Sequence, residues 1–105
     1  MTRDQAAATI KEFVEKTLAA ACYEYSGIGM TGGDIAARFH GLSEGYGFLL
    51  ALKYRPAGSP LTDANYQTLL NTFETSFYQL DADASHVKLK EVQSILTNAY
   101  GQLQP

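Results

Sequence analysis

The 105-residue chain has a single cysteine, Cys22, which excludes an internal disulfide and a cysteine-based zinc site. No long apolar run is present near its N-terminus, so the sequence shows neither a signal peptide nor a membrane span. Eight basic residues are scattered among eleven acidic ones, for a net charge of −3. Because no basic cluster is available to follow phosphates, nucleic acid is not expected as a main partner.

What is present is helical periodicity. Apolar residues make up 46% of the chain, enough for one core in a single domain, residues 1–105. Apolar side chains recur every three or four residues in four segments, at about residues 3–25, 31–55, 62–80 and 85–103. The loops between them are short, which favours antiparallel neighbours. The sequence therefore predicts an all-α fold, a four-helix up-down antiparallel bundle.

The predicted helices have recognisable boundaries. Residues 26–33 contain four glycines and predict the first break, with Thr31 as the N-cap of the second helix. Thr62 is the predicted N-cap of the third helix, and Asp83 or Ser85 that of the fourth. The first helix has one apolar face. Its members are Ile10, Phe13, Val14, Thr17, Leu18, Ala21, Cys22 and Tyr25.

The second predicted helix is rich in glycine, which costs about 1 kcal/mol relative to alanine in a helix interior. It contains Gly41, Gly45 and Gly47. Gly41 and Gly45 are four residues apart, and small residues at this spacing let two helices approach closely. The facing small residues are expected at positions 19–21 of the first helix. The alternative is that the glycines leave room for a bound group beside His40; we favour packing.

His40 and Glu44 are the candidate site of this helix, because residues four apart share a face. An imidazole and a carboxylate form half of a transition-metal site, for iron or zinc, or an acid/base pair. Further ligands would come from elsewhere, with His86 and Asp83 or Asp81 in reserve. The alternative is an ordinary polar pair at the edge of the bundle. No catalytic residues are indicated, so an enzyme is not expected.

Two other patterns have structural interpretations. Gly27, Gly29 and Gly32 spell GxGxxG, as in dinucleotide-binding loops, but an Ala-rich helical segment precedes them where that fold needs a strand. We interpret these glycines as a helix C-cap and turn. Cys22 lies on the apolar face of the first helix and is predicted to be a buried, inert thiol.

Several short motifs connect the chain to a known family. They are Ser43-Glu44, Gly47-Phe48, the Leu-x-Tyr-x-Pro step at Leu52, Tyr54 and Pro56, the Leu-Thr-Asp start at Leu61, and Tyr100-Gly101. With them, the last two-thirds of the chain resembles the C-terminal part of an uncharacterised bacterial helical domain-of-unknown-function family, distantly imelysin-like. The resemblance implies an all-helical domain of an exported or lipid-anchored protein of the cell envelope or periplasm.

The resemblance also bears on function. Imelysin-like proteins are implicated in iron uptake and carry a Gly-x-His-x-x-Glu motif. Here Arg38 replaces the glycine, and His40 and Glu44 have one residue more between them. Family members are longer, which implies that this chain pairs with another half or forms a homodimer. We therefore expect a non-enzymatic binding or interaction module, with iron or metal binding through His40 and Glu44 as the alternative.

Overall fold

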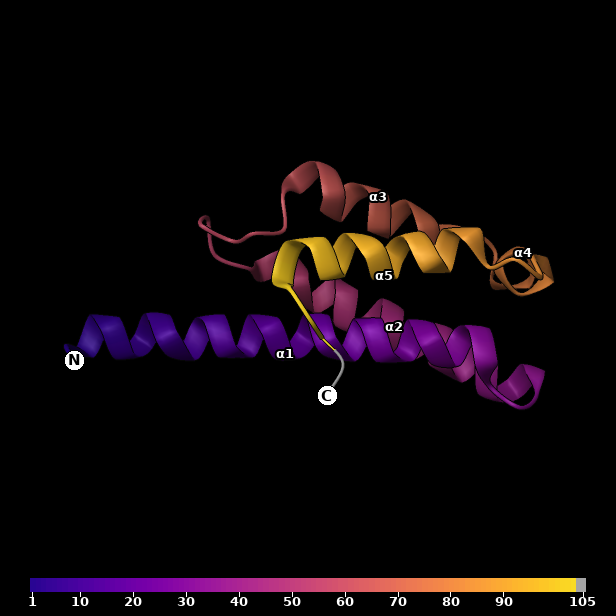
Figure 1. The fold of residues 1–105 in the computed structure, drawn as a ribbon, viewed down its shortest axis with the longest axis horizontal. Coiled ribbons are helices and arrows are strands. Elements are labelled where there is room, and N and C mark those ends of the chain that lie inside the picture. Colours follow the sequence, from indigo (N-terminus) through magenta and orange to yellow (C-terminus); the bar gives the residue numbers. More distant parts are fainter. Residues whose placement is uncertain (104–105) are drawn as a thin grey trace.

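The computed structural model describes residues 1–103, which contain five α-helices, one short 3-10 helix and no β-strand (Figure 1). The helices are α1 (Arg3–Thr31), α2 (Ile35–Ala51), η1 (Leu52–Tyr54), α3 (Asp63–Glu74), α4 (Phe77–Ala82) and α5 (Val87–Tyr100). The predicted all-α class is confirmed. Within residues 1–103, no helix is both long enough and apolar enough to cross a membrane.

The break between the first two helices lies later than predicted. α1 continues through Gly27 and Gly29 and ends at Thr31, where the Gly32 N–H donates to the carbonyl oxygen of Ile28 at 2.8 Å. Thr31 is therefore not the N-cap of α2. Asp34 takes that position, because its carboxylate accepts from the Ala37 N–H at 2.7 Å. The glycines are tolerated in α1 because other helices pack closely against them.

The later boundaries are partly as predicted. Thr62 caps α3, accepting from the Asn65 N–H at 3.1 Å. The third predicted helix is divided, because the backbone at Thr75 is extended and α4 starts only at Phe77. The predicted N-cap of the fourth helix, Asp83 or Ser85, is wrong, because α5 begins at Val87 and His86 occupies the N-cap position. The Asp83 carboxylate still accepts from the Val87 N–H, at 3.0 Å.

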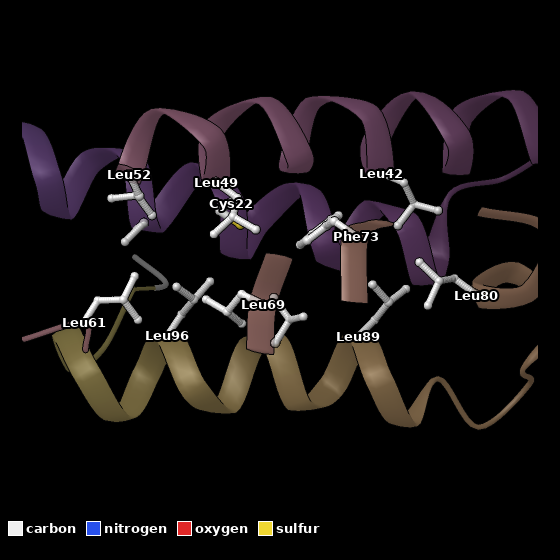
Figure 2. Close-up of a cluster of buried hydrophobic side chains, with 12 residues drawn as sticks. Cys22, Leu42, Leu49, Leu52, Leu61, Leu69, Phe73, Leu80, Leu89 and Leu96 are labelled. Carbon is white, nitrogen blue, oxygen red and sulfur yellow. The ribbon is translucent and has the colours of Figure 1, made fainter. Parts of the chain in front are cut away.

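The core lies between the α1–α2 pair and the α3–α5 pair (Figure 2). Leu42 and Leu49 of α2 face Leu89 and Leu96 of α5, and Phe73 of α3 lies between them. All five side chains are at most 2% exposed. Leucines from α2, α3, α4 and α5 thus meet Ala19 and Cys22 of α1 in one core, as the helical periodicity of the sequence requires.

α1 is longer than its neighbours. Its 29 residues span about 43 Å, against about 26 Å for the 17 residues of α2. The N-terminal half of α1 therefore extends beyond the other helices (Figure 1). Thr2 and Gln5 form a capping box at its free end. The predicted apolar face of the first helix is therefore correct at Cys22 and wrong at Phe13, which is nine residues away and lies on the opposite side of the helix, away from the core. The buried residues of α1 are Glu15, Ala19, Cys22, Ser26 and Gly29.

Candidate functional site

The two predicted metal ligands lie on α2, one turn apart. His40 is exposed and Glu44 is half-buried. No group of three or more histidine, cysteine, aspartate or glutamate residues that could hold a metal ion exists within residues 1–103. Metal binding through His40 and Glu44 stays a prediction, and it would need ligands from a second molecule.

The reserve ligands have other roles. Asp81 pairs with Arg38, with 2.6 Å between Nε and Oδ1, and this guanidinium holds the pKa of the Asp81 carboxyl below its usual range. Asp83 is engaged at the start of α5. His86 has left-handed backbone angles there, with φ of 52°, and its Nδ1 is buried without a hydrogen-bond partner among the described residues. These residues connect α2, α4 and α5.

Gly41 of α2 forms a close seam with α1, as the packing interpretation predicts, whereas Gly45 lies nearest to Phe73 of α3. A Cβ atom added to Gly41 would lie 2.8 Å from Cγ2 of Ile28 and 3.0 Å from the backbone nitrogen of Gly29. A Cβ added to Gly29 would lie 2.5 Å from Cδ2 of Leu42. The expected partners at 19–21 are wrong. Because α1 continues past residue 26, the turn comes later and Gly41 faces residues nearer to it.

The dinucleotide-like glycines lie in and after α1. Gly32 is the C-cap, as interpreted, whereas Gly27 and Gly29 lie inside the helix and allow close packing. A Cβ on Gly27 would lie 3.3 Å from Nε2 of Gln93 on α5. Cys22 is fully buried, and burial raises the pKa of its thiol to about 12. The prediction of a buried thiol is confirmed, and the raised pKa supports the expectation that it is inert, because the thiolate is the reactive form.

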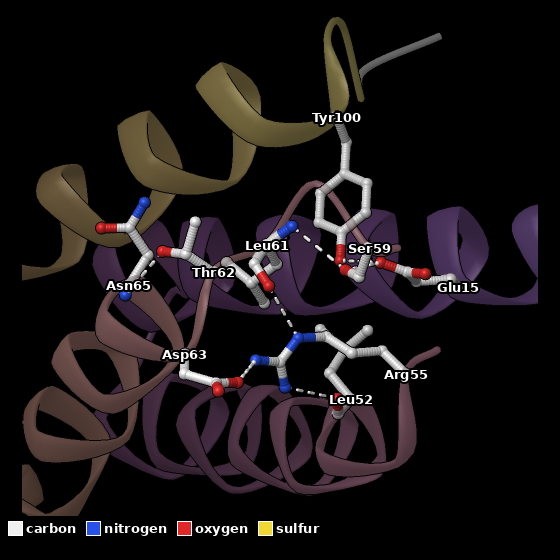
Figure 3. A network of polar contacts seen from close by, with 9 residues as sticks. All are labelled: Glu15, Leu52, Arg55, Ser59, Leu61, Thr62, Asp63, Asn65 and Tyr100. Carbon is white, nitrogen blue, oxygen red and sulfur yellow. Dashed lines mark hydrogen bonds and ion pairs between the residues drawn. The ribbon is translucent and has the colours of Figure 1, made fainter. Parts of the chain in front are cut away.

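Sequence reasoning missed a buried carboxylate. Glu15 of α1 is 5% exposed, and its Oε2 accepts from the hydroxyls of Ser59 and Tyr100, each at 2.5 Å (Figure 3). Burial raises the pKa of Tyr100, and the hydrogen bond to Glu15 raises this pKa further. Glu15 lies four residues before the buried Ala19, so its phase on the helix was the available signal.

Arg55 organises the loop that carries Ser59. Its guanidinium donates to the carbonyl oxygens of Leu52 and Leu61 and to the carboxylate of Asp63 (Figure 3). It also lies over the ring of Tyr66, at 4.7 Å from the ring centroid. The loop is therefore held from both sides, and it reaches α1 through Ser59.

We expect the Glu15→Ala variant to lower the free energy of unfolding by about 2–3 kcal/mol, because the half-buried Ser59 and Tyr100 hydroxyls lose their carboxylate acceptor. Glu15→Gln keeps one oxygen and should lose about half as much. Urea denaturation measures both. Glu12→Ala, on an exposed position of the same helix, is the control and should change stability by less than about 0.5 kcal/mol. Equal losses in Glu12→Ala and Glu15→Ala would contradict the network.

Two grooves flank the projecting half of α1. One, of about 680 Å³, lies between this half and the loop that carries Ser59. The other, of about 440 Å³, lies beside the end of α2 and is lined mainly by apolar residues that include Ile10, Val14 and Tyr54. Three large apolar side chains on this half of α1 are exposed: Ile10 by 63%, Phe13 by 72% and Val14 by 49%.

The fold and these surfaces define a small all-helical domain in which no three candidate metal ligands come together within residues 1–103. The chain belongs to the DUF4856 family, a domain of unknown function, whose family model matches residues 1–102. The match confirms the resemblance to a domain of unknown function and extends it over nearly the whole chain. Neither a curated protein nor a solved structure matches this chain. The distant relation to imelysins stays a prediction.

Proposed function

We propose that this chain is a non-enzymatic helical interaction module that associates with a second copy of itself through the projecting half of α1. The single observation that supports this proposal is the exposure of Ile10, Phe13 and Val14 on one side of one helix. Together with the small residues on that side they form the α1 stripe. Its members are Ala6, Ala7, Ile10, Phe13, Val14 and Thr17.

The bundle is proposed to be a scaffold for this stripe. α1 packs on α2, α2 on α3, α3 on α5 and α5 on α1, and this closed order supports the up-down four-helix arrangement. The short turn at Gly32 and Gly33 makes α1 and α2 antiparallel. The envelope setting implied by the imelysin-like resemblance is part of the same proposal.

The stripe is amphipathic in the manner of a helix that binds protein. Five charged residues of this half fall outside the stripe on a helical period, and Arg3 lies at the N-terminal end of the stripe. The five are Asp4, Lys11, Glu12, Glu15 and Lys16. Scattered exposed apolar residues are normal, but a contiguous set on one face is typical of an interaction surface. A convex helix face also offers little enclosure to a small molecule, which favours a helix of another chain as its ligand.

The size of the stripe indicates a weak dimer. Burying the exposed remainder of Ile10, Phe13 or Val14 is worth on the order of 1–2 kcal/mol each. The dimer would bury six such side chains, three from each copy. Their summed burial free energy is larger than the lower estimates of the free-energy cost of association, about 4 kcal/mol. We therefore expect dissociation constants in the micromolar to millimolar range.

Sedimentation equilibrium tests the proposal. The wild-type chain of 11.4 kDa should show a monomer–dimer equilibrium at high concentration. Phe13→Glu should weaken it by about tenfold or more, because the dimer would bury an unpaired carboxylate. The same change should leave the folding stability nearly unaltered, since Phe13 is 72% exposed in the monomer.

The matched control for this experiment is Val87→Glu on α5. It introduces the same charge at an apolar residue that is 60% exposed and lies outside the stripe. It should leave the dimerisation constant unchanged. A wild-type chain that remains a single 11.4 kDa species at millimolar concentration would disprove the proposal.

A further inference from the structure

We propose that the two copies pair with their α1 helices antiparallel, about a two-fold axis beside Ile10, so that Phe13 and Val14 of each chain face Ala6 and Ala7 of the other. This inference rests on the proposed self-association and names its geometry. An interface built in this way is complete in two copies, because each chain uses the same patch.

The order of residues in the stripe supports this geometry. Going along the helix, two small residues, Ala6 and Ala7, come before Ile10, and two large ones, Phe13 and Val14, come after it. Their distances from Ile10 are equal, at three and four residues in each direction. An antiparallel pair centred on Ile10 therefore places each large side chain over a small one, as interdigitated helix packing requires.

A parallel pair would fit less well. It would set Phe13 against Phe13 at one level and leave alanine against alanine a turn or two away. The large side chains would hold the helices apart where the alanines need them close. The antiparallel pair also places Thr17 of each chain opposite Arg3 of the other, so polar residues fall at both ends of the contact.

The position of the bundle supports the same arrangement. Glu15, Ala19 and Cys22 mark the buried side of α1, and the stripe lies on the opposite side on a helical period. The stripe side is exposed to solvent at Ile10, Phe13 and Val14, and the end of α2 lies beside it across a groove. In the antiparallel pair the overlap covers residues 3–17, about 22 Å, and the two bundles lie at its opposite ends. The first turn of the partner helix then covers the groove lined by Ile10, Val14 and Tyr54.

Cysteine cross-linking tests the register. We expect a mixture of the Ala7→Cys and Val14→Cys proteins to form a mixed disulfide several-fold more than either protein forms a disulfide with itself. In the proposed register, two copies of residue 14 are about 12 Å apart along the axis and two copies of residue 7 about 9 Å apart. Both separations are too long for a disulfide, whose Cα atoms lie within about 7 Å. Cys22 is fully buried and does not interfere.

The outcomes separate this inference from the proposed function. Self-disulfides that exceed the mixed one, in a chain that dimerises by sedimentation, would overturn the antiparallel register and leave the self-association standing. A chain that does not dimerise would overturn both. Val87→Cys is the control for random collision, since it lies outside the stripe and should cross-link least with either protein.

X-ray scattering gives a second readout that does not need cysteine. The monomer is 50 Å long. The proposed dimer overlaps only along the α1 stripe, so its longest dimension should be about 80 Å. A dimer no longer than the monomer would contradict the antiparallel arrangement, because it would require the two bundles to lie side by side.

Discussion

The Gly41→Leu variant should lose about 2–3 kcal/mol of unfolding free energy, because a large side chain would have to enter a seam that is already filled. Its Cβ alone would lie 3.0 Å from the backbone nitrogen of Gly29, and backbone cannot rotate away as a side chain can. Urea denaturation with two probes, far-ultraviolet circular dichroism and tyrosine fluorescence, measures the loss. The seam with α1 would have to open or shift to accept leucine.

Gly47→Ala is the matched control for this seam. Gly47 lies in the same helix, and nothing stands within 4 Å of a Cβ placed there. Alanine should therefore stabilise the protein by about 0.5–1 kcal/mol through its better helix propensity. A Gly41→Leu protein as stable as the wild type would show that the two helices are not in close contact.

The second large effect is expected for Phe73→Ala, which should cost about 3–5 kcal/mol. Phe73 is 2% exposed and stacks on Tyr46, with 6.1 Å between ring centroids. Its ring also lies against Gly45, where an added Cβ would be 3.3 Å from Cε1. Removing the ring leaves a cavity between α2, α3 and α5 that these rigid helices cannot close.

Tyr54→Ala serves as the comparison for Phe73→Ala. Tyr54 is an aromatic residue of similar size, but it is 84% exposed. Its loss should change the free energy of unfolding by less than about 1 kcal/mol. Thermal unfolding followed by calorimetry compares the two variants. Similar losses for both would mean that Phe73 does not lie at the centre of the core.

Local features were predictable from the sequence. Thr62 caps α3 because its hydroxyl reaches an N–H only three residues away, and such contacts depend on local sequence. Cys22 was predicted to be buried because helical periodicity places it among apolar residues. That Gly41 serves packing was also predictable, since glycine in a helix interior needs a compensating contact.

The interpretation of the sequence was wrong where contacts between residues far apart in the chain determine the structure. Residues 26–33 have the composition of a turn, yet most of them are helical because Gly29 packs against Leu42. That burial offsets the cost of glycine in the helix, and it moves the turn and the α1–α2 register. Glu15 is in phase with Cys22 on the helix and Glu12 is not, but only the contacts with Ser59 and Tyr100 make Glu15 a buried acceptor.

The candidate metal site was likewise predictable from the sequence only in part. The spacing of His40 and Glu44 placed them on one face of α2, but whether other ligands join them depends on tertiary contacts, and none within residues 1–103 completes a metal-binding group. The sequence by itself determined the helical class, the cap at Thr62 and the existence of apolar residues at helical spacing on α1, because these follow from hydrogen bonds and side-chain spacing within a few residues. Only the tertiary structure decided which side of α1 is buried. The other helices pack on the side of Glu15, Ala19 and Cys22 and are shorter than α1, so Ile10, Phe13 and Val14 stay exposed.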